Sequence, residues 1–143
     1  MTALSANRDT KKLASENYAQ KTFAILNGEI LYAGGMLAMN ISTLEVQMAS
    51  DSAGLVVLGR CPKYVDNTAD SEVSNVDFGV FQYANSTTYP LTKAYIGKVC
   101  YVEDDNTVGH GPGTNAVKAG IVYDVDDEGV WVTQKPQSIL ATS

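Results

Sequence analysis

Short alternations of apolar and polar residues, separated by turn residues, constrain this chain more than any other feature of its sequence. Every second residue is apolar in segments 44–48 and 76–80, which is the pattern of a strand with one buried face. Continuous apolar or β-branched runs occur at 55–58, 99–102 and 121–123, and the first of these predicts a strand buried on both faces. Clusters of glycine, asparagine and aspartate separate the runs at roughly ten-residue spacing, which is typical of a β-sandwich or barrel.

Two segments predict tight hairpins. Asn27-Gly28 lies between the apolar runs 23–26 and 30–32, and Asn-Gly is a favoured pair for two-residue turns with positive φ. A second turn at residues 126–129 joins the last two apolar runs. It predicts a final hairpin in which Trp131 is partly buried.

Helix signals are scarce. Thr92 is a good N-cap and Gly97 a good terminator, so the sequence predicts about one helical turn between them. We therefore expect an all-β fold, a compact sandwich or barrel-like domain with at most one short helical turn. Its expected organisation is an extended N-terminal arm over residues 1–21, a single β domain over 22–133 and a C-terminal tail over 134–143.

Charge and hydropathy exclude several classes of function. The chain of 143 residues has a formal net charge of -6, whereas binding to nucleic acid requires a basic surface. No apolar run approaches the roughly 20 residues that cross a bilayer, and the first 20 residues lack the apolar centre of a secretory signal. We expect a protein kept in the cytosol, with Cys61 and Cys100 as reduced thiols.

The N-terminal segment differs in charge from the rest of the chain. Residues 1–21 carry a local charge of +2, and the remaining residues carry -8. The segment has few large apolar side chains, so it cannot build a core of its own. It predicts an extended arm that becomes ordered on a partner, through the candidate partner-binding residues Leu4, Arg8, Lys11, Lys12 and Leu13.

Three segments resemble catalytic or ligand sites, and each is better explained otherwise. An EF-hand loop starting at Asp124 would place a cation, Lys135, where calcium needs a glutamate. The glycine-rich stretch 109–113 lacks the lysine and helix of a phosphate loop. Its glycine and proline residues predict a mobile loop, which would not hold His110 in place as a catalytic base. The acidic residues 103–105 are typical of a solvated turn rather than of a carboxylate pair.

These observations predict a protein that is not an enzyme, with no catalytic, cofactor-binding or metal-binding residues and no cofactor. Eight tyrosines against three phenylalanines indicate either a partner surface or the rim of the core, because tyrosine combines contact area with a polar end. Both interpretations remain open from the sequence.

Several phrases, in order along nearly the whole chain, resemble tailed-phage capsid decoration (cement) proteins. The opening residues 1–10 are similar to a common start in that family, Thr-Ala-Leu-x-Ala-Asn-Arg-x-Thr. The other phrases are residues 51–60 with 64–67, 76–81 with 85–86, 96–108, 119–120 and 129–132. Each phrase alone has low specificity, and the ordered set carries the resemblance. Residues 109–113 and 134–143 match nothing in the family.

The resemblance implies a virion protein on the capsid surface, present in the host cytoplasm during assembly. It would bind the major capsid protein and reinforce the shell, with no nucleic-acid or membrane partner. Closed symmetry is usual for identical chains, so we also expect a homo-oligomer, with a trimer favoured and a dimer as the alternative. A virion-surface β module that binds carbohydrate through exposed tyrosines and Trp131 is the alternative function. A small hydrolase is a third class, disfavoured by the position of His110.

Overall fold

The computed structural model describes residues 6–7 and 21–135. These residues form strands and turns almost throughout, with one 3₁₀ turn, η1 (Lys93–Tyr95). The prediction of an all-β fold with at most one short helical turn is therefore confirmed. Within the described part of the chain, no helix is long and apolar enough to cross a membrane.

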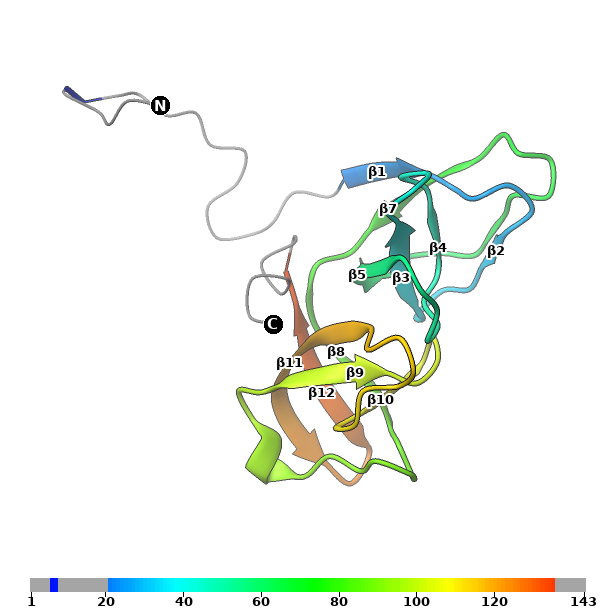
Figure 1. Cartoon of the computed structure of the whole chain (residues 1–143). Helices are drawn as coiled ribbons and strands as arrows, with labels where there is room; N and C mark the ends of the chain where they lie inside the picture. Colours follow the sequence, from blue (N-terminus) through cyan, green and yellow to red (C-terminus); the bar gives the residue numbers. More distant parts are fainter. Residues whose placement is uncertain (1–5, 8–20, 136–143) are drawn as a thin grey trace.

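Five strands from the C-terminal half close into a barrel, drawn in the lower part of Figure 1. They are β8 (Gly79–Asn85), β9 (Val99–Val102), β10 (Thr107–Gly109), β11 (Lys118–Asp126) and β12 (Gly129–Gln134). Their order around the barrel is β10-β8-β12-β11-β9. The pair β10-β8 is parallel and the other pairs are antiparallel. Closure removes the free edges that an open sheet would present.

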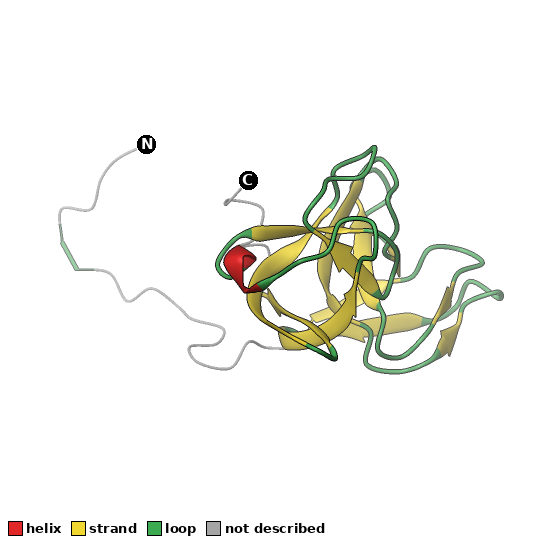
Figure 2. Cartoon of the chain, turned by 90° about the horizontal axis from the view of Figure 1, so that it is seen from below, coloured by secondary structure: helices red, strands yellow, loops and turns green. Residues whose placement is uncertain are grey.

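The N-terminal half forms three small sheets beside the barrel (Figures 1 and 2). Two of them are antiparallel pairs, β1 (Lys21–Ala24) with β7 (Val73–Val76) and β2 (Ile30–Leu31) with β6 (Val65–Asp66). The third has three strands in the order β4-β3-β5, namely β3 (Met36–Asn40), β4 (Val46–Met48) and β5 (Leu55–Arg60).

The sheet β4-β3-β5 separates two hydrophobic cores. Alternate side chains of its strands point to opposite sides, so Met36 and Val57 join one core while Leu37 and Leu58 join the other. The first, here called the barrel core, contains the buried barrel side chains, among them Tyr83, Val102, Val122, Val130 and Val132. The second, the N-terminal core, also contains Ile25, Leu31, Val46, Cys61, Val65 and Val76. The prediction that this run is buried on both faces is confirmed at Val57 and Leu58, whereas Leu55 and Val56 are half-buried.

A close backbone approach joins β5 to the segment that follows β7. Arg60 and Asp77 exchange both backbone hydrogen bonds at 3.0 Å, and their side chains form an ion pair at 3.0 Å. A Cβ at Gly59 would overlap the Asp77 carbonyl oxygen, so the absence of a side chain there permits the approach. The Arg60 guanidinium also lies 5.0 Å from the Phe81 ring centre and so ties this junction to the barrel.

The predicted hairpin at Asn27-Gly28 is wrong. A turn does form there, with Gly28 at φ +82°, but the strands on either side pair with β7 and β6 instead of with each other. Type I′ hairpin turns need positive φ at both central residues, and Asn27 does not have it. The turn packs on the buried Asn67, whose side-chain amide donates to the carbonyl oxygens of Ile25 at 3.0 Å and Leu26 at 3.1 Å.

Two alternating patterns do not form the continuous strands that the sequence predicts. Leu44 precedes β4 in a turn and is 63% exposed, whereas Val46 is buried. The alternation over residues 76–80 crosses from β7 to β8, and Val80 lies on the outside of the barrel, 39% exposed. In both segments the alternation of apolar and polar residues continues through positions that lie outside the strands, so the sequence alone suggests one unbroken strand.

The other local predictions are confirmed. The final hairpin forms between β11 and β12, where Asp126 pairs with Gly129, and Trp131 is half-buried. Thr92 caps η1 by accepting from the Ala94 backbone N–H at 3.3 Å, and Gly97 follows with φ +86°. The local sequence signals therefore predicted these turns correctly.

A buried polar pair inside the barrel generates the first prediction. The Tyr83 hydroxyl donates to Gln134 Oε1 at 2.7 Å, and Gln134 Nε2 donates to the Ala119 carbonyl oxygen at 3.1 Å. Tyr83→Phe leaves Gln134 Oε1 buried without this donor, so we expect a loss of about 1–3 kcal/mol in the free energy of unfolding. Urea unfolding followed by fluorescence measures it.

The matched control is Tyr123→Phe, because Tyr123 is 63% exposed and its hydroxyl can bond to water in either state. We expect little change from that substitution. A loss from Tyr83→Phe no larger than that from the control would contradict the role of the buried pair.

Candidate functional site

The five residues predicted to bind a partner, Leu4, Arg8, Lys11, Lys12 and Leu13, lie outside the described residues. The candidate sites that can be built from the structure are therefore on the β body. They are a pocket at the junction of the two halves, the titratable groups around it, and the exposed apolar side chains.

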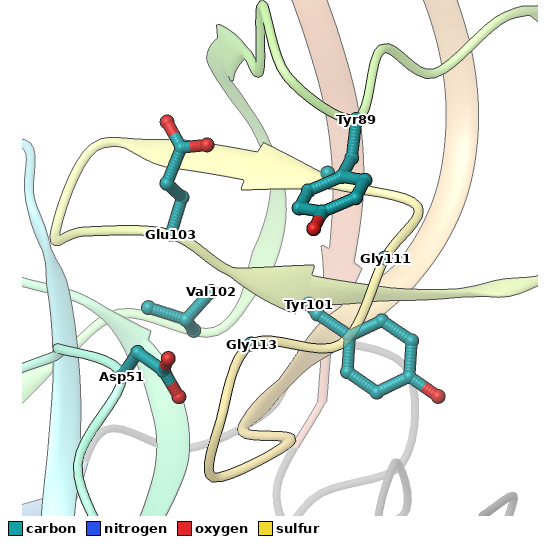
Figure 3. A pocket seen from close by; sticks show the side chains of 8 residues that line it. Asp51, Tyr89, Tyr101, Val102, Glu103, Gly111 and Gly113 are labelled. Atoms are coloured by element: carbon teal, nitrogen blue, oxygen red, sulfur yellow. The ribbon is translucent and has the colours of Figure 1, made fainter.

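The junction pocket lies where the β9–β10 end of the barrel meets the turn before β5. Its volume is about 170 Å³, and its lining includes Asp51, Tyr89, Tyr101 and Glu103. The two carboxylates lie on one side of the pocket and the two rings on the other (Figure 3). Gly111 and Gly113 complete the wall, and a Cβ at Gly113 would overlap the Asp51 carboxylate.

Asp51 makes three hydrogen bonds across this junction. Its two carboxylate oxygens accept the backbone N–H groups of Thr114 and Asn115, each at 2.9 Å, and its carbonyl oxygen accepts the Asn115 side-chain amide at 2.9 Å. The sequence identifies Asp51 only as a turn residue, because its partners are 63 and 64 positions away. With both oxygens engaged by the protein, Asp51 fastens a loop.

Each residue of the acidic run 103–105 makes a different hydrogen bond within the protein. Glu103 Oε1 accepts from the Ser86 hydroxyl at 2.7 Å, and Asp104 accepts the Asn106 backbone N–H at 2.9 Å. The Asp105 carbonyl oxygen accepts the Met36 N–H at 2.7 Å and so connects the barrel to β3. Burial raises the pKa of the Asp105 carboxyl, and the adjacent Asp104 charge adds to the effect. Glu103 and Asp104 are exposed, as a solvated turn predicts, and only the Asp105 backbone carbonyl oxygen connects this turn to the other half.

His110 is packed between aromatic rings. Its ring stacks on Tyr95 with centres 5.2 Å apart and meets the edge of Tyr89 at 5.5 Å. Its backbone N–H donates to the Tyr89 carbonyl oxygen at 3.0 Å. A Cβ at Gly111 would crowd the Tyr89 ring at 2.7 Å, so the glycine-rich loop lies closely against this tyrosine.

The acidic hairpin that resembles a calcium loop uses its carboxylates internally. Asp126 accepts from the backbone N–H groups of Glu128 and Gly129 and from the Trp131 indole N–H, the last at 2.9 Å. The Trp131 bond and these backbone bonds lower the pKa of Asp126. Asp124 pairs with Lys93 at 2.9 Å, which lowers its pKa as well. Among the described residues, no three histidine, cysteine or acidic side chains gather as a metal site would require.

The two cysteines lie in different cores. Cys61 belongs to the N-terminal core and Cys100 to the barrel core, and neither forms a disulfide. Burial raises the pKa of both thiols, that of Cys100 to about 12. They are protonated apolar side chains at neutral pH, as the sequence predicts.

Exposed aromatic side chains are divided among several places on the surface. Tyr32 and Tyr64 lie 5.8 Å apart, but their planes are inclined at 59°, so this pair is not a flat platform. On the outside of the barrel, Val80, Tyr123 and Trp131 line an open hollow of about 410 Å³.

Comparisons of the chain with models of protein families, with curated proteins and with solved structures found no match.

The Asp51 contacts generate the second prediction. Asp51→Ala removes both acceptors of the Thr114 and Asn115 amides, so we expect the free energy of unfolding to fall by about 1–2 kcal/mol. The local signature is faster hydrogen exchange at these two amides, with the β11–β12 amides protected as before. Asp127→Ala, at an exposed turn position, is the control. Unchanged exchange at residues 114 and 115 would contradict the fastening role.

The raised pKa of Asp105 generates the third prediction. Its carboxylate is less favourable in the folded chain than in the unfolded chain, so stability falls as the pH rises from the ordinary carboxyl pKa, about 4, through the raised value. Asp105→Asn removes this dependence. We expect the variant to be more stable than wild type at neutral pH and equal to it in acid, as measured by urea unfolding across that range. Asp127→Asn is the control, and we expect it to leave the free energy of unfolding unchanged at both acid and neutral pH. An Asp105→Asn variant that is less stable than wild type at neutral pH would refute the prediction.

Proposed function

We propose that this protein is a structural component of a phage virion that binds the outside of the assembled capsid and reinforces it. The observation that carries the proposal is where the family-like phrases fall in the fold. Residues 51–60 contain Asp51 and the whole of β5, which separates the two cores. Residues 96–108 include β9 and most of β10, and 129–132 include most of β12. The resemblance thus coincides with the segments that build the frame.

The architecture suits a reinforcing role. A cement protein transmits force between shell subunits, so its body must resist deformation. Here the closed barrel and the N-terminal sheets share one buried sheet. They are also fastened by the Asp51 contacts and the Arg60–Asp77 pair. Close-packed interiors have low compressibility, which supports such a task.

In this proposal the N-terminal residues make the contact with the shell. Leu4 and Leu13 fill apolar pockets on the major capsid protein or on a neighbouring copy, and Arg8, Lys11 and Lys12 meet carboxylates. Each fully buried leucine contributes about 1.5–3 kcal/mol, whereas exposed ion pairs contribute about 0–1 kcal/mol and are screened by salt. The apolar anchors therefore supply most of the affinity, and the charges steer docking.

Assembly as a symmetric oligomer, a trimer or else a dimer, follows from the same proposal. A capsid offers repeated symmetric sites, and identical chains favour closed symmetry. Several bodies joined together present several arms, so that one docking event raises the effective concentration of the next. Bound monomers without contact to a sister copy would argue against this arrangement.

A ligand-binding module on the virion surface is the second candidate, and one observation favours it. The exposed Tyr123 and the half-buried Trp131 both line the open hollow on the barrel, and aromatic rings at a hollow suit the apolar faces of sugars. Binding to an oligosaccharide array that Tyr123→Ala abolishes would favour this candidate over the capsid role.

Deletion of residues 1–17 tests the capsid role and is the fourth prediction. The cut precedes β1, which begins at Lys21, so we expect the truncated chain to keep its unfolding transition. Its binding to shells assembled from the major capsid protein of the same genome, measured by co-sedimentation, should fall severely. A truncated chain that coats shells as fully as wild type would contradict the proposal, and so would one that fails to fold.

A further inference from the structure

The loop between β3 and β4 exposes two aliphatic side chains at one point of the surface. Ile41 is 56% exposed and Leu44 is 63% exposed, and only Ser42 and Thr43 lie between them. Residues 41–44 are here called the hairpin tip. Ile41 lies against the turn before β5, where its N–H donates to the Gly54 carbonyl oxygen at 3.0 Å.

Hydrogen bonds hold the hairpin tip in one conformation. The Leu44 N–H donates to the Asn40 carbonyl oxygen at 2.7 Å, and the Asn40 N–H donates to the Glu45 carbonyl oxygen at 2.9 Å. The Asn40 side-chain oxygen accepts the N–H groups of Ser42 at 2.9 Å and Thr43 at 3.3 Å. The tip is therefore a preorganised structure that presents its two apolar side chains to solvent.

Leu44 adopts a backbone conformation that does not suit leucine. Its φ is +61°, in the left-handed region where a Cβ is unfavourable and where glycine or asparagine is usual. The side chain is largely exposed, so the fold gains little from burying it. A leucine here costs stability in its backbone and recovers little by packing. Backbone strain of this kind clusters at functional positions.

We infer that the hairpin tip is a docking knob, with Ile41 and Leu44 inserted into an apolar pocket on the surface of the shell protein. This inference rests on the proposed capsid role and names a second contact besides the N-terminal residues. The knob gains affinity because the tip is already ordered before binding, so little conformational entropy is lost.

The size and charge of the tip favour a pocket on the shell over the same tip of a second copy. Two partly exposed aliphatic side chains present on the order of 100–200 Å² of apolar surface, so two tips alone cannot reach the roughly 1,200 Å² of a stable interface. On the shell, the tip would add to the contact already proposed for the N-terminal residues. Residues 36–44 contain no charged side chain, unlike the acidic body around them. A shell pocket for the tip would be apolar, and this contact would be insensitive to salt.

The test uses substitutions that suit the backbone but remove the knob. Leu44→Gly and Leu44→Asn both tolerate positive φ, so we expect a melting temperature equal to that of wild type or higher by about 2–4 °C. We also expect at least tenfold weaker binding to shells of the major capsid protein from the same genome, because a buried leucine contributes that much. This loss should be equal at low and high salt.

Ala116→Gly is the matched control. Ala116 is also exposed and has φ +49°, so the substitution relieves the same kind of strain without removing a large apolar side chain. It should bind shells as wild type does. Sedimentation velocity on each free variant shows whether Leu44 instead holds copies of this chain together.

The outcomes separate this inference from the proposed function. Wild-type protein that does not bind shells would refute the capsid role, and the knob with it. Wild-type binding together with unchanged binding by both Leu44 variants would overturn the knob alone. A lower oligomeric state of the free variants would also overturn it, because Leu44 would then contact a second copy. A lower melting temperature in both variants would show that Leu44 serves the fold.

Discussion

Burial of both faces of the sheet β4-β3-β5 is the constraint on which the other parts of the structure depend. A three-stranded sheet buried on both sides needs apolar residues at consecutive positions, as at Met36–Leu37 and Val57–Leu58. Each face must then be covered by a separate layer. The barrel covers one face, and the pairs β1-β7 and β2-β6 belong to the core on the other. Both cores include side chains of the shared sheet, so neither is complete without it.

Specific polar contacts set the relation between the two halves once burial has brought them together. Asp51 fastens the loop after β10, and the Asp105 carbonyl oxygen receives the Met36 N–H. Arg60 pairs with Asp77 and lies over Phe81 of the barrel. Apolar burial is non-directional, whereas these hydrogen bonds and the ion pair have fixed geometry. At residues 103–105 the contact across the two halves is made by the Asp105 backbone carbonyl oxygen and not by the acidic side chains.

The proposed capsid role brings together two kinds of contact with different physical signatures. The N-terminal residues combine leucines with basic side chains, so their contact should respond to salt. The hairpin tip is uncharged and preorganised, so its contact should not. A decoration protein that used both would be steered by charge and retained by apolar insertion. Repetition of such weak contacts around a symmetric oligomer would then give firm attachment through effective concentration.

Local structure could be predicted from the amino-acid sequence. Period-two patterns identified the all-β class, Thr92 and Gly97 bounded η1, and the turn at 126–129 paired β11 with β12. The other strand pairings depend on contacts between distant segments, which no local pattern predicts. The turn at Asn27-Gly28 packs on Asn67, which lies some forty residues away. The alternation through Leu44 stops because residues 41–44 form a turn with a left-handed leucine. Asp51 and Ile41–Leu44 carry no signal of their roles, because burial, exposure and backbone φ result from contacts between segments far apart in the sequence.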